Sequence, residues 1–114
     1  MRLRSTLAAS LGALALIVTV PNSAWAANGY FGYSYTGADG QRQIGQLIDP
    51  PSRECVNLPE VSDPAASEPA HSPRNFTDAT AVLFTDADCE GDHFALRPGG
   101  RASERLKLRS VVFS

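Results

Sequence analysis

The pattern of hydrophobic and polar residues after residue 26 predicts short β-strands separated by turns. Residues 30–36 are aromatic and β-prone, residues 37–40 form a Gly- and Asp-containing turn, and residues 41–48 can return as a second strand. These segments predict a β-hairpin, which the Asp-Pro-Pro sequence at residues 49–51 ends. Beyond residue 26 no segment shows a sustained helical period.

The last third of the chain has the clearest strand pattern. Residues 79–84, 93–97 and 106–113 are three predicted strands. In the last of them, the even-numbered residues from Leu106 to Val112 share one face, and the odd-numbered residues from Lys107 to Phe113 share the other. Several strands at this spacing predict an all-β sandwich or a small barrel.

A long loop is predicted between these regions. A short strand at residues 54–58 is followed by residues 59–73, which hold four prolines among Ala, Ser, Glu and Asp. Loops of this length are often functional. Two interpretations remain open, a binding loop stiffened by its prolines and a tolerated, mobile insertion.

The first 26 residues have the layout of an export signal. Arg2 and Arg4 give a positive start, residues 7–20 are apolar, and small residues precede the expected cleavage point. A membrane span needs about 20 apolar residues, and this run stops sooner at a proline. We expect a helical signal peptide over 1–26, cleavage between Ala26 and Ala27, and a secreted, extracellular domain of about 88 residues.

Removal of the signal makes the protein more acidic. The full chain has a formal net charge of −2, and the loss of Arg2 and Arg4 changes it to about −4. A small domain with this charge repels phosphate groups, so we expect no nucleic-acid partner and, after signal removal, no membrane partner. We also expect a monomer.

Cys55 and Cys89 are the two cysteines of the chain. In an oxidising extracellular setting, a disulfide between them is the default interpretation. They lack the C-x-x-C spacing of a zinc site, and the sequence places no partnering base beside either thiol. The predicted Cys55–Cys89 disulfide closes a loop of about 35 residues and contributes about 4 kcal/mol in the chain-entropy model.

The residues from position 84 onward resemble the Greek-key motif of the βγ-crystallin superfamily. An aromatic residue, Phe84, is followed by Cys89 and Gly91, and Ser110 comes near the end of the chain. The resemblance implies that Phe84 and Cys89 pack in a folded hairpin, that Gly91 takes a conformation other residues resist, and that Ser110 ties the last strand to this hairpin. It also implies two Greek-key motifs in a βγ-crystallin-like sandwich.

The two motifs would cover the whole domain. Residues 27–78 are the first, degenerate motif, with Ser72 in the place of Ser110, and residues 79–114 are the second. Within the superfamily, the chain is similar to small secreted actinobacterial proteins and to the metalloproteinase inhibitors of Streptomyces. The segments that carry this likeness are residues 55–59, 75–77, 89–91, 96–99 and 109–113.

The resemblance raises the question of calcium, which many βγ-crystallins bind through a pair of Asn or Asp residues upstream of the motif serine. Here Arg105, Lys107 and Arg109 stand just before Ser110 and would repel the ion. We therefore predict no motif-type calcium site, no other metal site and no cofactor. The acidic residues of the 86–92 turn are interpreted as solvated.

The sequence contains no motif of a known catalytic machinery. Signatures of serine hydrolases, zinc proteases and nucleotide-binding enzymes do not occur. Asp88 or Glu90 could act with His93, but these residues lie on an adjacent turn and strand with no pocket in evidence. We expect no catalytic residues and no enzyme.

Two functional hypotheses remain. The first is a secreted, non-enzymatic binding protein whose partner is an extracellular protease, specifically a metalloprotease that it inhibits. The second is a structural or stress-related extracellular module with no protease target. A toxin-like or antimicrobial role belongs to the superfamily's repertoire but has no residue-level support here. The inhibitors carry more cysteines than this chain, so their reactive bond cannot be transferred to a position in it.

Overall fold

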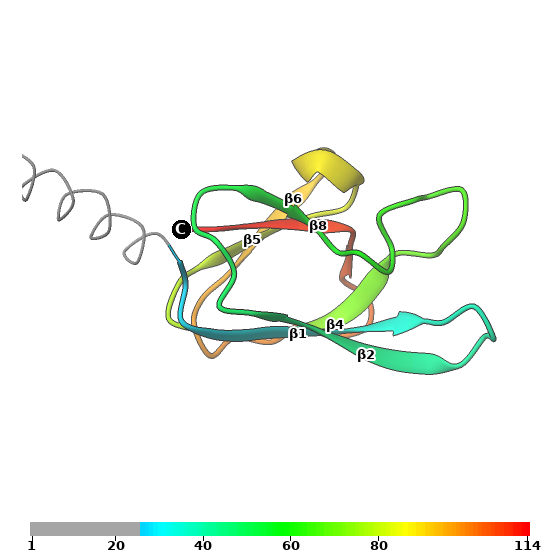
Figure 1. The fold of residues 1–114 in the computed structure, drawn as a ribbon, viewed down its shortest axis with the longest axis horizontal. Coiled ribbons are helices and arrows are strands. Elements are labelled where there is room, and N and C mark those ends of the chain that lie inside the picture. Colours follow the sequence, from blue (N-terminus) through cyan, green and yellow to red (C-terminus); the bar gives the residue numbers. More distant parts are fainter. Residues whose placement is uncertain (1–25) are drawn as a thin grey trace, which may run out of the picture.

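Residues 26–114 are described by the computed structural model, and their strands form two antiparallel sheets packed face to face (Figure 1). The expected all-β sandwich is thus confirmed. The expected signal peptide lies almost wholly outside the described residues. Ala27, the first residue after the predicted cleavage point, is buried, and its N–H donates to the Pro50 carbonyl at 2.8 Å.

The first sheet has the strand order β2-β1-β4-β7. The bounds of its strands are β1 Gly29–Thr36, β2 Arg42–Ile48, β4 Ala70–Thr77 and β7 Lys107–Leu108. The register sets Phe31 of β1 opposite Leu47 and Asn75, so β1 is paired on both sides. The β1–β2 hairpin predicted from the sequence is present.

The second sheet has the order β3-β8-β5-β6. Its strands are β3 Cys55–Asn57, β5 Ala81–Phe84, β6 His93–Leu96 and β8 Ser110–Phe113, and the short 3-10 turn η1 covers Ala87–Cys89. Each half of the described chain gives its first, second and fourth strands to one sheet and its third strand to the other. The two halves are therefore interlocked, and neither sheet is complete without both.

The core lies between the sheets and is built by inward-facing aromatic and aliphatic side chains. Alternation along β1 places Phe31 and Tyr33 inside, where they are almost fully buried. Phe31 meets Phe113 of the opposite sheet edge to face, with ring centroids 5.5 Å apart. Burying each such side chain stabilises the fold by roughly 1.5–3 kcal/mol.

The structure corrects the predicted extent of the long loop. Strand β4 begins at Ala70, so the loop ends before the Pro73 at which the sequence placed its end. The register of β4 on β1 shifts between Gly32 and Ser34, and Ser72 has a φ of 54°. Pro73 lies in this bulge, where its missing N–H does not break a regular ladder.

The structure also corrects the prediction of one continuous strand over residues 106–113. The chain crosses from one sheet to the other at Arg109, which separates β7 from β8. Four consecutive residues, from Leu108 to Val111, are buried. Leu108 and Val111, which strict alternation would place on opposite faces, both lie in the hydrophobic core, so the predicted alternation of faces fails at the crossing.

Two glycines of the β1–β2 hairpin provide a matched pair for testing the packing. A Cβ on Gly45 would lie 2.6 Å from Cζ and 2.7 Å from the hydroxyl oxygen of buried Tyr33, whereas a Cβ on Gly32 would meet nothing closer than 3.9 Å. We predict that Gly45→Ala lowers the free energy of unfolding by about 1–3 kcal/mol and that Gly32→Ala does not lower it. Urea denaturation of both variants measures this, and equal stabilities would contradict the packing described.

Candidate functional site

A tightly folded turn caps one side of the sandwich, between β5 and β6. Ser110, at the start of β8, holds it: its hydroxyl donates to the Asp86 carbonyl at 2.6 Å and accepts from the Cys89 N–H at 2.8 Å. Ser110 is fully buried. Its two hydrogen bonds connect the turn to the sheet beneath.

The turn needs unusual backbone conformations. Asp88 and Cys89 have φ values of 60° and 56°, and Gly91 has a φ of 84°. A Cβ on Gly91 would collide with the side chain of Thr85 and lie 2.8 Å from Asp86 Oδ2. Glycine is required at this position for both reasons. Phe84, at the entry to the turn, is half-buried with its ring 6.1 Å from that of His93.

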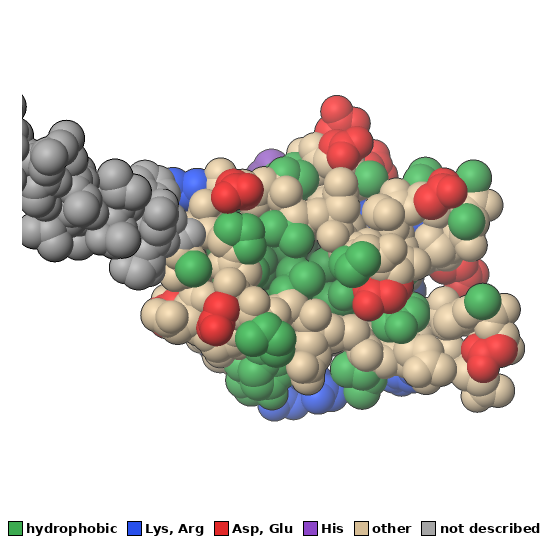
Figure 2. Space-filling model, viewed as in Figure 1, with side chains coloured by type: hydrophobic (Ala, Val, Ile, Leu, Met, Phe, Trp, Pro, Cys, Tyr) green, Lys and Arg blue, Asp and Glu red, His purple; other side chains and the backbone are tan. Residues whose placement is uncertain are grey.

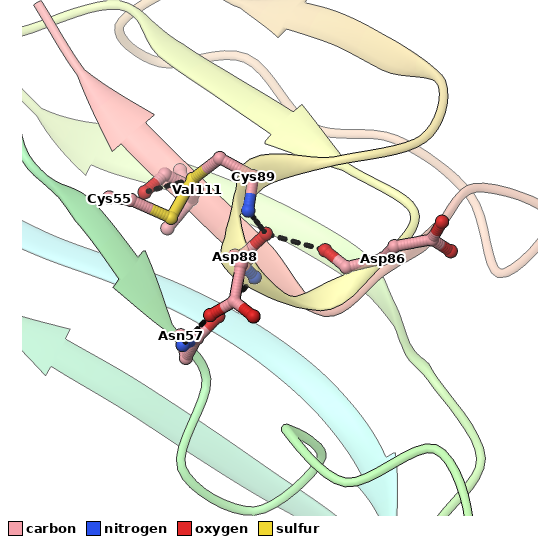
Figure 3. The surroundings of a disulfide bond; sticks show 7 residues. Cys55, Asn57, Asp86, Asp88, Cys89 and Val111 are labelled. Carbon is pink, nitrogen blue, oxygen red and sulfur yellow. Dashed lines mark hydrogen bonds between the residues drawn. A yellow bond between two sulfur atoms is a disulfide. The ribbon is translucent and has the colours of Figure 1, made fainter.

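A disulfide fastens strand β3 to this turn (Figure 3). Cys55 and Cys89 are bonded, with their Cα atoms 5.9 Å apart, as the sequence predicted. Asn57 adds a second connection: its side-chain oxygen accepts from the Asp88 N–H at 2.8 Å, and its amide donates to Asp88 Oδ1 at 3.0 Å. The chain that leaves β3 therefore starts from a fixed point.

Residues 59–69 leave β3 as a long connection that we call the anchored loop. The guanidinium of Arg109, a residue that is only 8% exposed, holds this loop by hydrogen bonds. Nη1 donates to the Val61 carbonyl at 2.8 Å and to Ser67 Oγ at 3.3 Å, and Nη2 donates to the Ser67 carbonyl at 2.9 Å. The guanidinium thus spans both ends of the loop's exposed part.

Apolar side chains and a tyrosine fix the start of the loop. Leu58 and Val61 are fully buried, and the Val61 N–H donates to the Leu58 carbonyl at 3.1 Å. The Tyr33 hydroxyl donates to Glu60 Oε1 at 2.6 Å. Burial, and then the hydrogen bond and charge of Glu60, raise the pKa of Tyr33, so this hydroxyl keeps its proton at physiological pH.

The tip of the anchored loop, residues 63–66, is exposed but internally hydrogen-bonded. Asp63 Oδ1 accepts from the Ala65 N–H at 2.9 Å, and the Asp63 carbonyl accepts from Ser67 Oγ at 2.8 Å. Beside it lies the tip of the β1–β2 hairpin, and the two tips border an open hollow of about 400 Å³. Both tips project at the end of the sandwich away from residue 26 (Figure 1).

The other side chains singled out from the sequence do not meet in a chemical site. The carboxylates of the 86–92 turn and His93 are exposed, and Asp88 bonds Asn57. No group of His, Cys, Asp and Glu in residues 26–114 is arranged to hold a metal ion. The same residues contain no helix with the length and hydrophobicity of a membrane span.

The proposed equivalence of Ser72 and Ser110 has a limited structural counterpart. Ser72 Oγ lies 2.9 Å from His71 Nδ1. Ser110, by contrast, bonds the backbone of a folded turn. The first half has an open β1–β2 hairpin where the second half has the folded turn.

Sequence reasoning missed the roles of Arg109 and Asn75. Asn75 is fully buried: Nδ2 donates to the Ala79 and Leu96 carbonyls, and Oδ1 accepts from the Thr77 N–H and hydroxyl. It therefore holds the connection between the sheets. Arg109 had one available signal, since it is a charged residue directly before the Ser110 that the sequence placed in the motif and before the hydrophobic residues 111–113.

Comparisons of the chain with protein-family models, with curated proteins and with solved structures give no match. The class of this protein is therefore defined by its fold and its site alone. It is an interlocked, antiparallel β-sandwich with one disulfide and a loop held by a buried arginine.

The disulfide has a direct test. Replacement of both cysteines, Cys55→Ala with Cys89→Ala, should lower the free energy of unfolding by about 2–4 kcal/mol, because the unfolded chain regains the entropy of a loop with 34 residues of separation. Denaturation with and without reductant measures it. The double variant, which should not respond to reductant, is the control, and two free thiols in the oxidised wild-type protein would contradict the pairing.

Arg109 has a separate test. Arg109→Met keeps most of the apolar stem but leaves the Val61 and Ser67 carbonyls without the guanidinium, which should cost about 1–3 kcal/mol of stability. Hydrogen exchange should quicken at the amides of residues 61–67 more than elsewhere. Arg97→Met, at an exposed arginine, is the control. Unchanged exchange in the loop would show that Arg109 does not hold it.

Proposed function

We propose that this chain is a secreted, non-enzymatic protein of the βγ-crystallin type that binds an extracellular protease and inhibits it through the anchored loop. The observation that carries the proposal is the fixation of an exposed tip, residues 63–66, by the buried guanidinium of Arg109. The target class, a metalloprotease, is inferred only from the sequence likeness to the Streptomyces inhibitors. No contact within residues 26–114 bears on it.

The strand order supports the Greek-key part of the proposal. A Greek key has three consecutive hairpin-connected strands and a fourth that returns beside the first. In each half, the fourth strand lies beside the first, as β4 does beside β1 and β8 beside β5, while the third strand joins the opposite sheet. The folded turn tied to Ser110 is a further feature expected of this type.

Pre-organisation supports the inhibitory part. A loop that is already ordered loses little conformational entropy when a partner binds it. The anchored loop follows strand β3, which the disulfide fixes in place. The buried side chains of Leu58 and Val61 attach its start to the core, and hydrogen bonds from Arg109 hold it further along. If a protease cuts such a loop, the two new chain ends stay close together, because both remain attached to the fold. The disulfide also supports an oxidising, extracellular location.

The proposal is tested by titrating the purified, disulfide-bonded protein against thermolysin-type metalloproteases and serine proteases. We expect inhibition of a metalloprotease at micromolar concentration or below, and weakening by at least tenfold in Ala65→Lys at the loop tip. Ala95→Lys, an equal change on exposed β6, is the control and should inhibit like the wild type.

Two outcomes would reject the inhibitor function. One is the absence of inhibition at micromolar concentration, and the other is rapid digestion of the loop as an ordinary substrate. Either result would leave the structural or stress-related module as the better interpretation.

A further inference from the structure

The outer face of the first sheet, which the proposed function does not use, is organised in lateral rows by the strand register. One row is apolar and consists of Ile48, Tyr30 and Phe76. The Tyr30 and Phe76 rings are 4.9 Å apart. These three side chains are between 38% and 64% exposed, a large apolar surface for a domain of this size.

The next two rows mix polar, basic and apolar side chains. Gly32 lies between Gln46 of β2 and Arg74 of β4. The backbone of Arg74 also forms an isolated antiparallel β-bridge with Arg101. Beyond them, Ser34 lies between Ile44 and His71, and His71 is paired with Lys107 of β7. Ile44 is 70% exposed. The three rows together are called the outer face below.

A hollow of about 190 Å³ occupies the middle of the outer face. It forms where Gly32 has no side chain, and its walls include Tyr30, Ile44, Phe76 and Arg74. The hollow is large enough for one apolar side chain of a partner. Its rim has an arginine on one side and exposed apolar groups at both ends.

The charge of the outer face is opposite to that of the protein. Arg74, Arg101 and Lys107 lie in its rows, and Arg42 lies beside them, where it donates to Ser34 Oγ. These four are half of the Lys and Arg side chains of residues 26–114. No position in its rows is Asp or Glu. Figure 2 shows basic and hydrophobic side chains together along the lower rim, beneath β1, β2 and β4, and acidic side chains at several places above that rim.

The surroundings of His71 agree with this charge. Burial, followed by the charges of Lys107 and Arg42, lowers the pKa of His71, while Glu104 and Glu68 oppose the shift. Asp49 and Asp78 border the apolar row, where they accept hydrogen bonds from uncharged groups of Gly29 and Asn28. The basic character of the outer face is therefore concentrated in the two rows of Arg74 and Lys107. The outer face therefore favours an anionic partner.

The composition of the outer face narrows the partner's class. A second copy of this chain seated face to face would bring the same basic side chains together, which opposes such a dimer. A sugar ligand would stack on aromatic rings, but two of the four exposed apolar side chains are isoleucines. Aliphatic and aromatic groups around a hollow that fits a single side chain, with Arg74 on one side of it, are suited to a polypeptide.

We propose that the outer face of β2, β1 and β4 is a docking surface for an acidic polypeptide segment that inserts an apolar side chain into the hollow over Gly32. Acidic groups of the segment would then pair with Arg74 and its basic neighbours. This surface shares no residue with the hollow beside the anchored loop, so it can act whether or not the protein inhibits a protease.

The test uses a fluorescent synthetic peptide that alternates glutamate with leucine, titrated into the purified protein and followed by anisotropy. We expect saturable binding that weakens as salt is raised. A glutamate–serine peptide should bind at least tenfold more weakly because it has no apolar group to insert, and a lysine–leucine peptide should not bind. Vesicles of phosphatidylglycerol and the polysaccharide heparin serve as the other anionic probes.

Two variants test the location. Gly32→Val should fill the hollow and reduce the affinity at least tenfold, and it should still fold because a Cβ there meets nothing within 3.9 Å and valine suits a strand. Arg74→Glu should have a similar effect through its charge. Arg97→Glu, an equal charge change outside the rows, is the control, and thermal melts verify that all three are folded.

Three results would overturn the proposal. Equal peptide affinity in wild type, Gly32→Val and Arg74→Glu would place any binding elsewhere. Binding of vesicles or heparin without binding of the acidic peptide would identify an anionic membrane or polysaccharide as the partner. Concentration-dependent dimerisation that Gly32→Val abolishes would show that a second copy occupies the face.

Discussion

The buried guanidinium of Arg109 connects the sandwich to its longest loop. A charge removed from water has to be surrounded by hydrogen-bond acceptors, and this arginine has no carboxylate partner among the hydrogen bonds described. Backbone carbonyls of Val61 and Ser67 fill that need. The loop is thus required to fold back over the crossing between β7 and β8, because otherwise the guanidinium would be buried without partners. Stability and loop shape are set by the same contacts.

The crossing at Arg109 depends in turn on Ser110, the next residue. Ser110 holds the folded turn between β5 and β6, and the turn carries Cys89, whose disulfide fixes β3 at the base of the loop. Three successive connections therefore run from the last strand to the turn, from the turn to β3, and from β3 into the loop. A change in any of them should reach the exposed tip.

Sequence alone predicted the parts of this arrangement that local chemistry determines. Segments of β-prone residues between turn residues located most strands, and two cysteines in a chain with an export-type leader indicated the disulfide. It failed where tertiary structure overrides local pattern. Pro73 argued against a strand, but a bulge accommodates it, and residues 106–113 looked like one strand because the transfer between sheets at Arg109 leaves no local signature. The role of Asn75 was missed because its partners, Ala79 and Leu96, are identified only by the fold.

The separation of charge between surfaces has a physical consequence for binding. The protein has an excess of acidic groups, yet its outer face has basic side chains and no acid in its rows. An acidic partner that approaches from another side is repelled, and one that approaches the outer face is attracted. The protein's electrostatic field therefore orients an acidic partner toward the outer face before the two make contact. The anchored loop, whose exposed residues include Asp63 and Glu68, has the opposite preference. The two proposed binding surfaces therefore differ in the charge of the partner that each attracts, so the two proposals do not require their partners to compete for one site.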